Sequence, residues 1–422
     1  MAFRQIGRWA AIDLAILFLL GSFGKTPSAL ASPMYTLTDL GQDGQYDVSG
    51  LNDLGQVIAE TWSGLERTNL LYNSFGPSAG QMTVINSGVL DDQTINNKGQ
   101  VLFNNTTGLA GNGISVLSLS SGTTTSVPTL VAPPYQSWGV AINDQGQVAG
   151  YSVLYDQSKN LYQPQSFVTS NGTVTSLGNL PGGRWNEATA MNNQGQVVGY
   201  VAFGANSGSL APTTTHAYLY SNGSMKDLGT LGGSNSQASG INDAGQIVGN
   251  STNAQGALQA FLYQKGSMQD LGTLGGVNSQ AMAINNAGQI VGMANTSQPG
   301  KWLWFNDETT TQSQIAHAFL YQNGQMIDLN SVIPAGLGWT LISANLINNL
   351  GQIVGLGLAA DGTDHYFLLT PSNLPQPPDP NSIASVPEPS TLAFSFLVIA
   401  ALAIRGRTSR ASEQWQQRYL WK

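Results

Sequence analysis

The stretch Ile241-Asn-Asp-Ala-Gly-Gln-Ile-Val-Gly249 decides the architecture, because its pattern recurs along the chain at long and nearly regular spacing. The other six copies begin at Leu51, Ile95, Ile142, Met191, Ile284 and Ile347. The glycines of the seven copies, at 55, 99, 146, 195, 245, 288 and 351, lie 43 to 50 residues apart except for a last spacing of 63. Such a period predicts a fold built from one repeated supersecondary unit.

Each copy predicts a β-hairpin. An apolar residue ends one strand, and the Asn that follows can hydrogen-bond the backbone two residues further on. The Gly supplies the left-handed conformation that a three-residue hairpin loop with a bulge requires. Gln-Ile-Val-Gly then starts a second strand rich in β-branched residues. A series of helix caps is excluded, because no apolar period of 3.6 residues follows the Gly.

The clearest complete repeat predicts four short strands, at Ala238–Asn242, Gln246–Ser251, Ala260–Tyr263 and Ser267–Leu271. Four strands in a period of this length are typical of one blade of a β-propeller. A β-solenoid is the alternative, but its coils are usually shorter and it needs polar end caps, which this sequence lacks. The fold class we predict is therefore all-β, a β-propeller spanning residues 34–370.

The two ends of the repeat region indicate how the propeller closes. Tyr35-Thr-Leu-Thr-Asp-Leu-Gly41 resembles a fourth strand with no blade before it, and the seventh repeat stops after His365–Leu369 with no fourth strand behind it. Pairing of these two segments would remove exposed sheet edges. We predict seven four-stranded blades closed by the N-terminal strand. An insertion at Lys301–Gln314 could instead add a strand.

The third and fourth strands carry a family resemblance. His317-Ala-Phe-Leu-Tyr321, Asp270-Leu-Gly-Thr-Leu-Gly-Gly276 and Gly240-Ile-Asn-Asp-Ala-Gly-Gln-Ile-Val-Gly249 together resemble the HAF repeat of bacterial extracellular proteins. The match is specific over residues 186–370 and partial over 34–185. The resemblance implies export and a repeat scaffold, and it transfers no catalytic residue.

Composition narrows the function. The chain has 422 residues, 50 Gly, no Cys and 9% charged residues, which suits a turn-rich β protein without disulfides or thiolate metal sites. The net charge is −8, and most basic residues lie near the two ends, so residues 32–387 carry about −13. Because such a surface repels phosphate backbones, we expect no nucleic-acid partner.

The N-terminus predicts a cleaved export signal over residues 1–31. Arg4 and Arg8 precede the short apolar run Leu14–Leu20, and Ala29-Leu-Ala31 supplies a small-residue cleavage pattern. We expect signal peptidase to cut between Ala31 and Ser32. A transmembrane anchor is the alternative, but the run is too short to span a bilayer.

The C-terminus predicts a second sorting signal. A proline-rich linker, residues 371–385, leads to Pro387-Glu388-Pro389, the apolar run Leu392–Ile404 and a basic cluster at Arg405, Arg407 and Arg410. Residues 386–410 resemble the PEP-CTERM signal of Gram-negative bacteria, followed here by a polar tail, 411–422. The resemblance implies a short C-terminal membrane helix as a transient inner-membrane anchor. It also implies cleavage near Pro387–Pro389 by an exosortase-type enzyme and delivery to the outer surface or extracellular matrix. An ordinary C-terminal anchor is the alternative.

No catalytic or metal site is predicted. His216, His317 and His365 occupy the same slot of the third strand in different repeats, which indicates a structural role. The Asn-Asp-x-Gly turns lack the alternating oxygen ligands and the closing Glu of a calcium loop. We expect no cofactor. The carboxylates outside the repeat pattern, and so the candidates for glycosidase chemistry, are Glu60, Glu66, Glu187, Asp307 and Glu308.

Ligand-binding candidates are the residues that depart from the repeat. Trp138, Trp185 and Trp339 each fall just ahead of a predicted first strand, and Arg184 and Glu187 flank Trp185. Indoles at one mouth of a propeller could stack on sugar rings, whereas indoles between blades would only pack. Three hypotheses follow: a non-enzymatic surface protein that binds extracellular polysaccharide or a surface partner, a carbohydrate-active hydrolase or lyase, and a purely structural matrix component.

Overall fold

The computed structural model describes residues 34–44, 46–63, 66–87, 90–105, 113–131, 136–156, 161–204, 214–299 and 314–374. The chain divides into two compact units, residues 1–376 and 377–422. The predicted export signal, the insertion at 301–313, most of the linker, the PEP-CTERM segment with its helix and the polar tail lie outside the described residues. In the described ranges, no helix has the length and hydropathy needed to cross a membrane.

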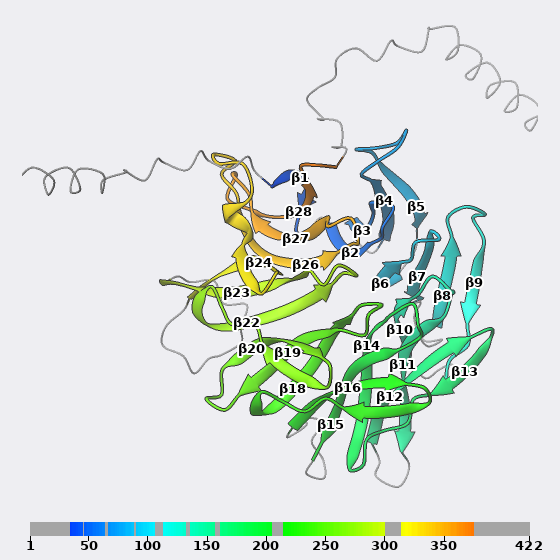
Figure 1. Ribbon diagram of the computed structural model, residues 1–422. Helices are drawn as coiled ribbons and strands as arrows, with labels where there is room; N and C mark the ends of the chain where they lie inside the picture. The colour runs from blue at the N-terminus through cyan, green and yellow to red at the C-terminus, as the bar shows by residue number, and fades with distance from the viewer. Residues whose placement is uncertain are drawn as a thin grey trace, which may run out of the picture. The chain divides into compact units, whose positions relative to one another are not determined.

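The described chain is almost entirely β-structure, with one short 3-10 helix, η2 (Leu329–Ser331). Its strands follow the repeats (Figure 1), with four in each of the first six repeats and three in the seventh. The first three repeats form separate four-stranded sheets: β2–β5 (Tyr46–Leu51, Gln56–Ser63, Glu66–Asn73, Met82–Ser87), β6–β9 (Leu90–Ile95, Gln100–Asn105, Gly113–Ser118, Thr124–Val127) and β10–β13 (Ser137–Ile142, Val148–Asp156, Leu161–Ser170, Thr173–Ser176).

The fourth and fifth repeats, β14–β17 (Gly183–Met191, Val197–Phe203, Thr214–Ser221, Ser224–Asp227) and β18–β21 (Gly232–Ile241, Ile247–Asn253, Leu258–Gln264, Ser267–Asp270), are joined by one parallel bridge, Thr215 to Asn235. The sixth repeat forms β22–β25 (Gly275–Ile284, Ile290–Pro299, Gln314–Gln322, Gln325–Asp328). The seventh supplies β26 (Thr340–Ile347), β27 (Ile353–Leu358) and β28 (Asp364–Pro371). Four strands in each of the first six repeats, and three in the seventh, match the expectation from the sequence.

The seven Asn-containing turns are the hairpins that the sequence predicts. In the fifth repeat, the Gly245 N–H donates to the Asn242 carbonyl and the Asn242 N–H donates to the Gln246 carbonyl, each at 3.0 Å. Gly245 has φ +73°, the left-handed region that favours glycine. The Asn242 side chain accepts from the Ala244 N–H, two residues on, at 3.1 Å. The same bonds recur in every repeat.

A second glycine lets the first two strands of a repeat approach closely. In the fifth repeat, a Cβ atom on Gly249 would collide with the Gln237 carbonyl oxygen on the neighbouring strand. The register of β18 against β19 shifts between Ala238 and Gly240, opposite this contact. The glycine therefore permits a bulge in the first strand, which increases local twist.

The N-terminal strand lies against the last repeat. β1 (Tyr35–Gln42) pairs antiparallel with β28, from Tyr35 opposite Pro371 to Gln42 opposite His365. The resulting sheet has the order β1-β28-β27-β26. Figure 1 shows β1, in blue, beside β28, in orange. This pairing between the two ends of the repeat region is the one that the unmatched strands predict.

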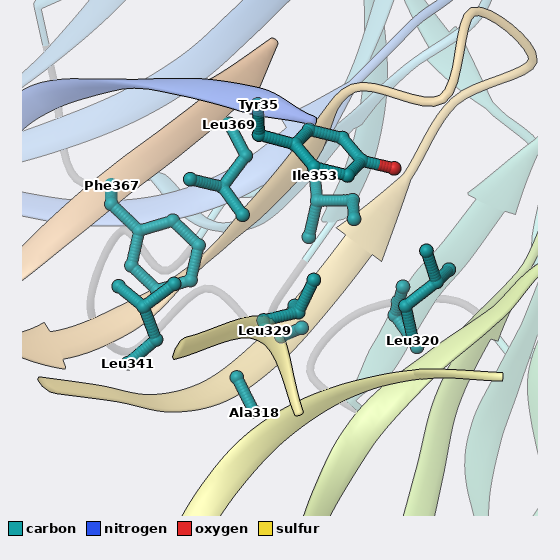
Figure 2. Close-up of a cluster of buried hydrophobic side chains, with 10 residues drawn as sticks. Tyr35, Ala318, Leu320, Leu329, Leu341, Ile353, Phe367 and Leu369 are labelled. Carbon is teal, nitrogen blue, oxygen red and sulfur yellow. The ribbon is translucent and has the colours of Figure 1, made fainter. Parts of the chain in front are cut away.

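Apolar side chains fill the space between neighbouring sheets. The cluster in Figure 2 joins Leu320 of β24 with Leu341 of β26, Phe367 of β28 and Tyr35 of β1. The third strands of five repeats each contribute one fully buried aromatic ring, and these rings are Phe167, Tyr218, Phe261, Phe319 and Phe367. Packing between sheets thus holds the repeats together. The first strands of the repeats all line one common cavity.

Candidate functional site

The Asn residues of the seven turns are joined in a closed ring of hydrogen bonds. Each Asn side-chain Nδ2 donates to the backbone carbonyl of the equivalent Asn in the next repeat, at 2.8–3.2 Å. The bond from Asn348 to the Asn52 carbonyl, at 2.9 Å, links the last repeat to the first. All seven are 3–4% exposed. Because buried amides need partners, this ring fixes each turn against its neighbour.

The residue after each ring Asn forms a second closed ring. Its side-chain Oδ1 accepts the backbone N–H of the preceding repeat, at 2.7–2.9 Å. Acid and amide alternate in this ring except where Asn286 adjoins Asn349, and the order is Asp53, Asn97, Asp144, Asn193, Asp243, Asn286 and Asn349. Each Asp Oδ2 accepts Nδ2 donors from the Asn on either side, at 2.8–3.3 Å. The three carboxylates are therefore balanced by amide donors.

The two rings surround a small polar cavity, which we call the turn cup. Its volume is about 190 Å³. It is lined by the apolar residue that precedes each turn, the ring Asn and the following Asp or Asn in all seven repeats. The cup is therefore made of repeat-pattern residues, and their polar atoms are occupied with one another.

A second cavity, which we call the channel cavity, lies between the first strands of the repeats. Its volume is about 500 Å³, and none of its lining residues is charged. Backbone and small or apolar side chains form most of its wall, with hydroxyl groups from Ser49, Thr94, Thr189 and Ser239. Trp138 and Tyr151 are its aromatic residues. Their rings are stacked, with centroids 5.2 Å apart and planes at 25°.

Five apolar residues line both cavities. Ile142, Met191, Ile241, Ile284 and Ile347, each just before a turn Asn, line both the turn cup and the channel cavity. Ile142, Ile241 and Ile284 are only 8–9% exposed. These five residues, which we call the apolar partition, form the part of the channel cavity wall that lies nearest the turns.

The predicted cluster around Trp185 lies on β14 and is organised by Tyr200 of β15. The Tyr200 hydroxyl donates to Glu187 Oε2 at 2.5 Å. Trp185 meets the Tyr200 ring edge-on, at 5.8 Å and 74°. Burial raises the pKa of Tyr200, and the hydrogen bond to Glu187 raises it further. The Tyr200 hydroxyl therefore keeps its proton and donates it in a hydrogen bond to Glu187. Arg184 precedes Trp185 on the same strand and is half-buried.

Trp339 has a packing role. Its ring meets His365 edge-on at 5.9 Å and Phe367 at 6.5 Å. It packs against the hydrophobic cluster that holds Tyr35 and Phe367. This is the arrangement expected for an indole that stabilises the repeats.

The three predicted indoles are therefore not brought together at one cavity. Trp138 lines the channel cavity, whereas Trp185 and Trp339 are not among its lining residues. From the sequence we predicted that all three indoles fall just ahead of a first strand, and this prediction is wrong for Trp138 and Trp185. Trp138 lies inside β10 and Trp185 inside β14, because both strands begin earlier than the apolar pattern indicates. Only Trp339 precedes its strand, β26.

The three histidines each pair with an acid on the adjacent strand of their own sheet. His216 contacts Asp227 at 2.8 Å, and His317 contacts Asp328 at 2.7 Å. In the seventh repeat the acid comes from the N-terminal strand, and His365 contacts Asp39 at 2.9 Å. Asp39 thus takes the position that strand four supplies elsewhere.

Of the carboxylates outside the repeat pattern, the structure describes the side chains of two, Glu60 on β3 and Glu187 on β14, and these strands belong to different sheets. Glu60 is 6% exposed, and Glu187 is held by Tyr200. The side chain of Glu66, and Asp307 and Glu308 entirely, lie outside what the structure describes. Over the described ranges, no three His, Asp or Glu residues converge in a way that could hold a metal ion.

Sequence reasoning missed Tyr151 and both hydrogen-bonded rings. Tyr151 reaches Trp138 because β10 and β11 pair with these residues opposite each other. The register depends on the bulge at Gly139–Ala141, which the sequence pattern does not reveal. The Asp and Asn residues of the turns can be found in the sequence. That they hydrogen-bond from one repeat to the next is known only from the structure.

Comparison with known proteins gives a fold and no function. Residues 234–365 match a family model described as "Protein of unknown function (DUF3466)". No curated protein matches the chain. A puromycin-hydrolysing peptidase of Mycobacterium tuberculosis is similar in structure, with TM-score 0.50 and 11% identity over 82% of this chain and 54% of that one.

The β-propeller domain of the Trilobed protease from Pyrococcus furiosus is also similar, with TM-score 0.48 and 9% identity over 68% of this chain and 81% of that one. The chain spans about half the length of several of the peptidases that it matches. The similarity to the puromycin-hydrolysing peptidase is one of fold alone, and the described residues of this chain are themselves almost entirely β-structure.

Proposed function

We propose that this protein is an exported, surface- or matrix-sorted β-propeller that binds an extracellular polysaccharide without catalysing a reaction on it. The single observation that carries the binding role is the stacked pair Trp138–Tyr151 in the wall of the uncharged channel cavity. Aromatic faces stack on the apolar faces of sugar rings, and sugar hydroxyls need nearby acceptors and donors. The cavity supplies both.

The propeller in this proposal has seven blades and is closed twice. Pairing of β1 with β28 supports closure at the outer edge. The bonds from Asn348 to Asn52 and from Asn349 to Asp53 support closure at the centre. Seven turns take part in each ring, which supports a count of seven.

Export and sorting rest on the two ends of the sequence. The basic, apolar and small-residue segments of residues 1–31 support cleavage between Ala31 and Ser32. Pro387-Glu388-Pro389, the apolar run and the arginine cluster support sorting by an exosortase-type enzyme to the outer surface or matrix of a Gram-negative bacterium. Mass spectrometry of protein recovered from the culture matrix tests both cuts, and an intact residue 1–31 or 386–410 segment would contradict them.

The binding proposal is tested with the host's own extracellular polysaccharide. The exported protein is mixed with the polymer, and retained protein and polymer chain length are followed over time. We expect retention with no shortening, loss of retention in Trp138→Ala, and normal retention in Trp185→Ala, the matched change at an indole outside the cavity.

A purely structural role is the second candidate, and Trp339 favours it because that indole packs between sheets. Absence of retention in the wild-type protein would support this candidate. Shortening of the polymer would overturn both and support a carbohydrate-active enzyme. Tyr200 and Glu187 would then be the first residues to change.

A further inference from the structure

Resting on the proposed function, we infer that the channel cavity is a blind pocket for the terminal residue of a glycan. The residue that fits is an uncharged sugar that carries an apolar substituent, such as a 6-deoxy methyl or an N-acetyl group. The polymer itself stays outside the cavity. The protein thus recognises chain ends and does not thread the chain.

The apolar partition closes the cavity at its inner end. Ile241 and Ile284 line both cavities and are 8–9% exposed. Both also belong to hydrophobic clusters, Ile284 with Val248 and Ala281 and Ile241 with Val198 and Ala238. A hydrated polymer chain would have to displace these packed side chains to reach the turn cup. Its hydroxyls would lose their hydrogen bonds to water there, and the apolar side chains of the partition offer no replacement partners. Access is therefore from the end where Trp138 lies.

The rings beyond the partition argue against a second route through the turns. The amide groups of the first ring are already bonded to the next turn, and the carboxylates of the second ring are bonded to flanking amides. A ligand passing through would have to compete with these buried hydrogen bonds, and buried polar groups left without partners are costly.

The wall selects against charge. No Asp, Glu, Lys, Arg or His lines the cavity. A charged sugar would lose its hydration there without a counter-charge, which is unfavourable. The surrounding domain is also acidic, with about −13 over residues 32–387, so a uronic acid is repelled before it enters.

The wall offers acceptors beside apolar patches. The Thr189 hydroxyl donates to the Ala238 carbonyl at 2.9 Å, and the Ser239 hydroxyl donates to the Ala281 carbonyl at 2.6 Å. With their protons committed, both oxygens act as acceptors for ligand hydroxyls. Met282 and Leu346 supply apolar surface for a methyl group.

The aromatic pair orients the sugar. Tyr151 stacks on Trp138, which holds the indole in one orientation, and both residues line the cavity. One face of Trp138 is thus prepared for the ligand, and prepared groups lose less entropy on binding. The volume of about 500 Å³ falls among those of ligand pockets, about 300–1,000 Å³.

The test uses monosaccharides as competitors in the polymer-retention assay on the full exported protein. The probes are methyl α-L-rhamnoside, N-acetylglucosamine, methyl glucoside and glucuronic acid, and tryptophan fluorescence reports direct binding. We expect the rhamnoside or N-acetylglucosamine to release the polymer and to change the fluorescence, and glucuronic acid to do neither. Trp138→Ala should weaken that binding at least tenfold, and Leu350→Ala, an exposed residue at a turn, should not.

The outcomes separate this inference from the proposed function. Polymer retention that depends on Trp138 but resists all four sugars would overturn the inference and leave the binding role. Sugar binding without polymer retention would leave the inference and overturn the polymer-binding role. Equal binding of glucuronic acid, or no binding of sugar or polymer, would overturn the inference.

Discussion

The turn cup and the channel cavity share the apolar partition as part of their walls, but the residues that line them differ in kind. The cup uses the same residues in every repeat, and its polar atoms are bonded to one another. The channel cavity uses positions that differ from repeat to repeat, and there the repeats supply Trp138, Thr189, Ser239 and Met282. In this repeat protein, shared residues hold the repeats together and variable ones create a place for a ligand.

The largest effect is expected at the outer closure. Tyr35→Ala removes a ring that is 3% exposed in the cluster of Figure 2 and leaves the turn rings unchanged. We expect a loss of about 4 kcal/mol in the free energy of unfolding, measured by chemical denaturation. Tyr155→Ala, at an exposed tyrosine, is the control. An equally small loss in both variants would mean that the turn rings alone hold the ends together.

The turn ring comes next. Asn348 donates to Asn52 and Gln352 and accepts from the backbone of Leu350 and Gln352. Asn348→Ala leaves these buried partners unsatisfied, and we expect a loss of about 3 kcal/mol. Asn349→Ala, at an exposed position of the second ring, should cost about 1 kcal/mol. Thermal unfolding measures both, and the reverse order would contradict a structural role for the first ring.

A pH-dependent effect is expected at Asp328. Burial raises its pKa, but hydrogen bonds from His317 and Asn330 outweigh burial, so the pKa is below its ordinary value. A lowered folded-state pKa gives stability that is present above the unfolded pKa of about 4 and lost as pH falls through the folded value. Asp328→Asn should therefore cost about 1 kcal/mol near pH 6 and little near pH 2.

Asp270→Asn is the matched control for Asp328. It occupies the same fourth-strand position in the fifth repeat, where Gln259 replaces the histidine. Its loss should be smaller at every pH. Unfolding curves between pH 2 and 6 check this, and equal losses in the two variants would show that the histidine contributes nothing.

The sequence predicted the elements of the fold better than it predicted the site. The hairpin turns, the four strands of each repeat and the pairing of Tyr35–Gly41 with the last repeat follow from local turn chemistry and from strands left unmatched at the ends. These signals are short in sequence or repeated many times, so pattern alone reveals them.

The candidate site depends on contacts that pattern does not contain. Trp138 contacts Tyr151 because a bulge sets the register of β10 against β11. Trp339 instead packs against Phe367 and His365. All three predicted indoles sit at similar places in the repeat, so the sequence treats them alike. Their neighbours differ, and the neighbours decide which one reaches the cavity.

The smallest effect on stability is expected at Trp138 itself. Because Trp138 is only half-buried and lines the cavity wall, Trp138→Ala should change the free energy of unfolding by about 1 kcal/mol or less. Chemical denaturation measures this. A loss as large as that of Asn348→Ala would place Trp138 among the residues that hold the fold.

The most direct test measures melting temperature and polysaccharide retention together in Trp138→Ala and Asn348→Ala, with retention measured well below the melting temperature of both. We predict opposite outcomes: Trp138→Ala keeps its melting temperature and loses retention, whereas Asn348→Ala has a lower melting temperature and keeps retention. If both variants lose the same property, the division between a structural turn ring and a ligand-binding cavity is wrong.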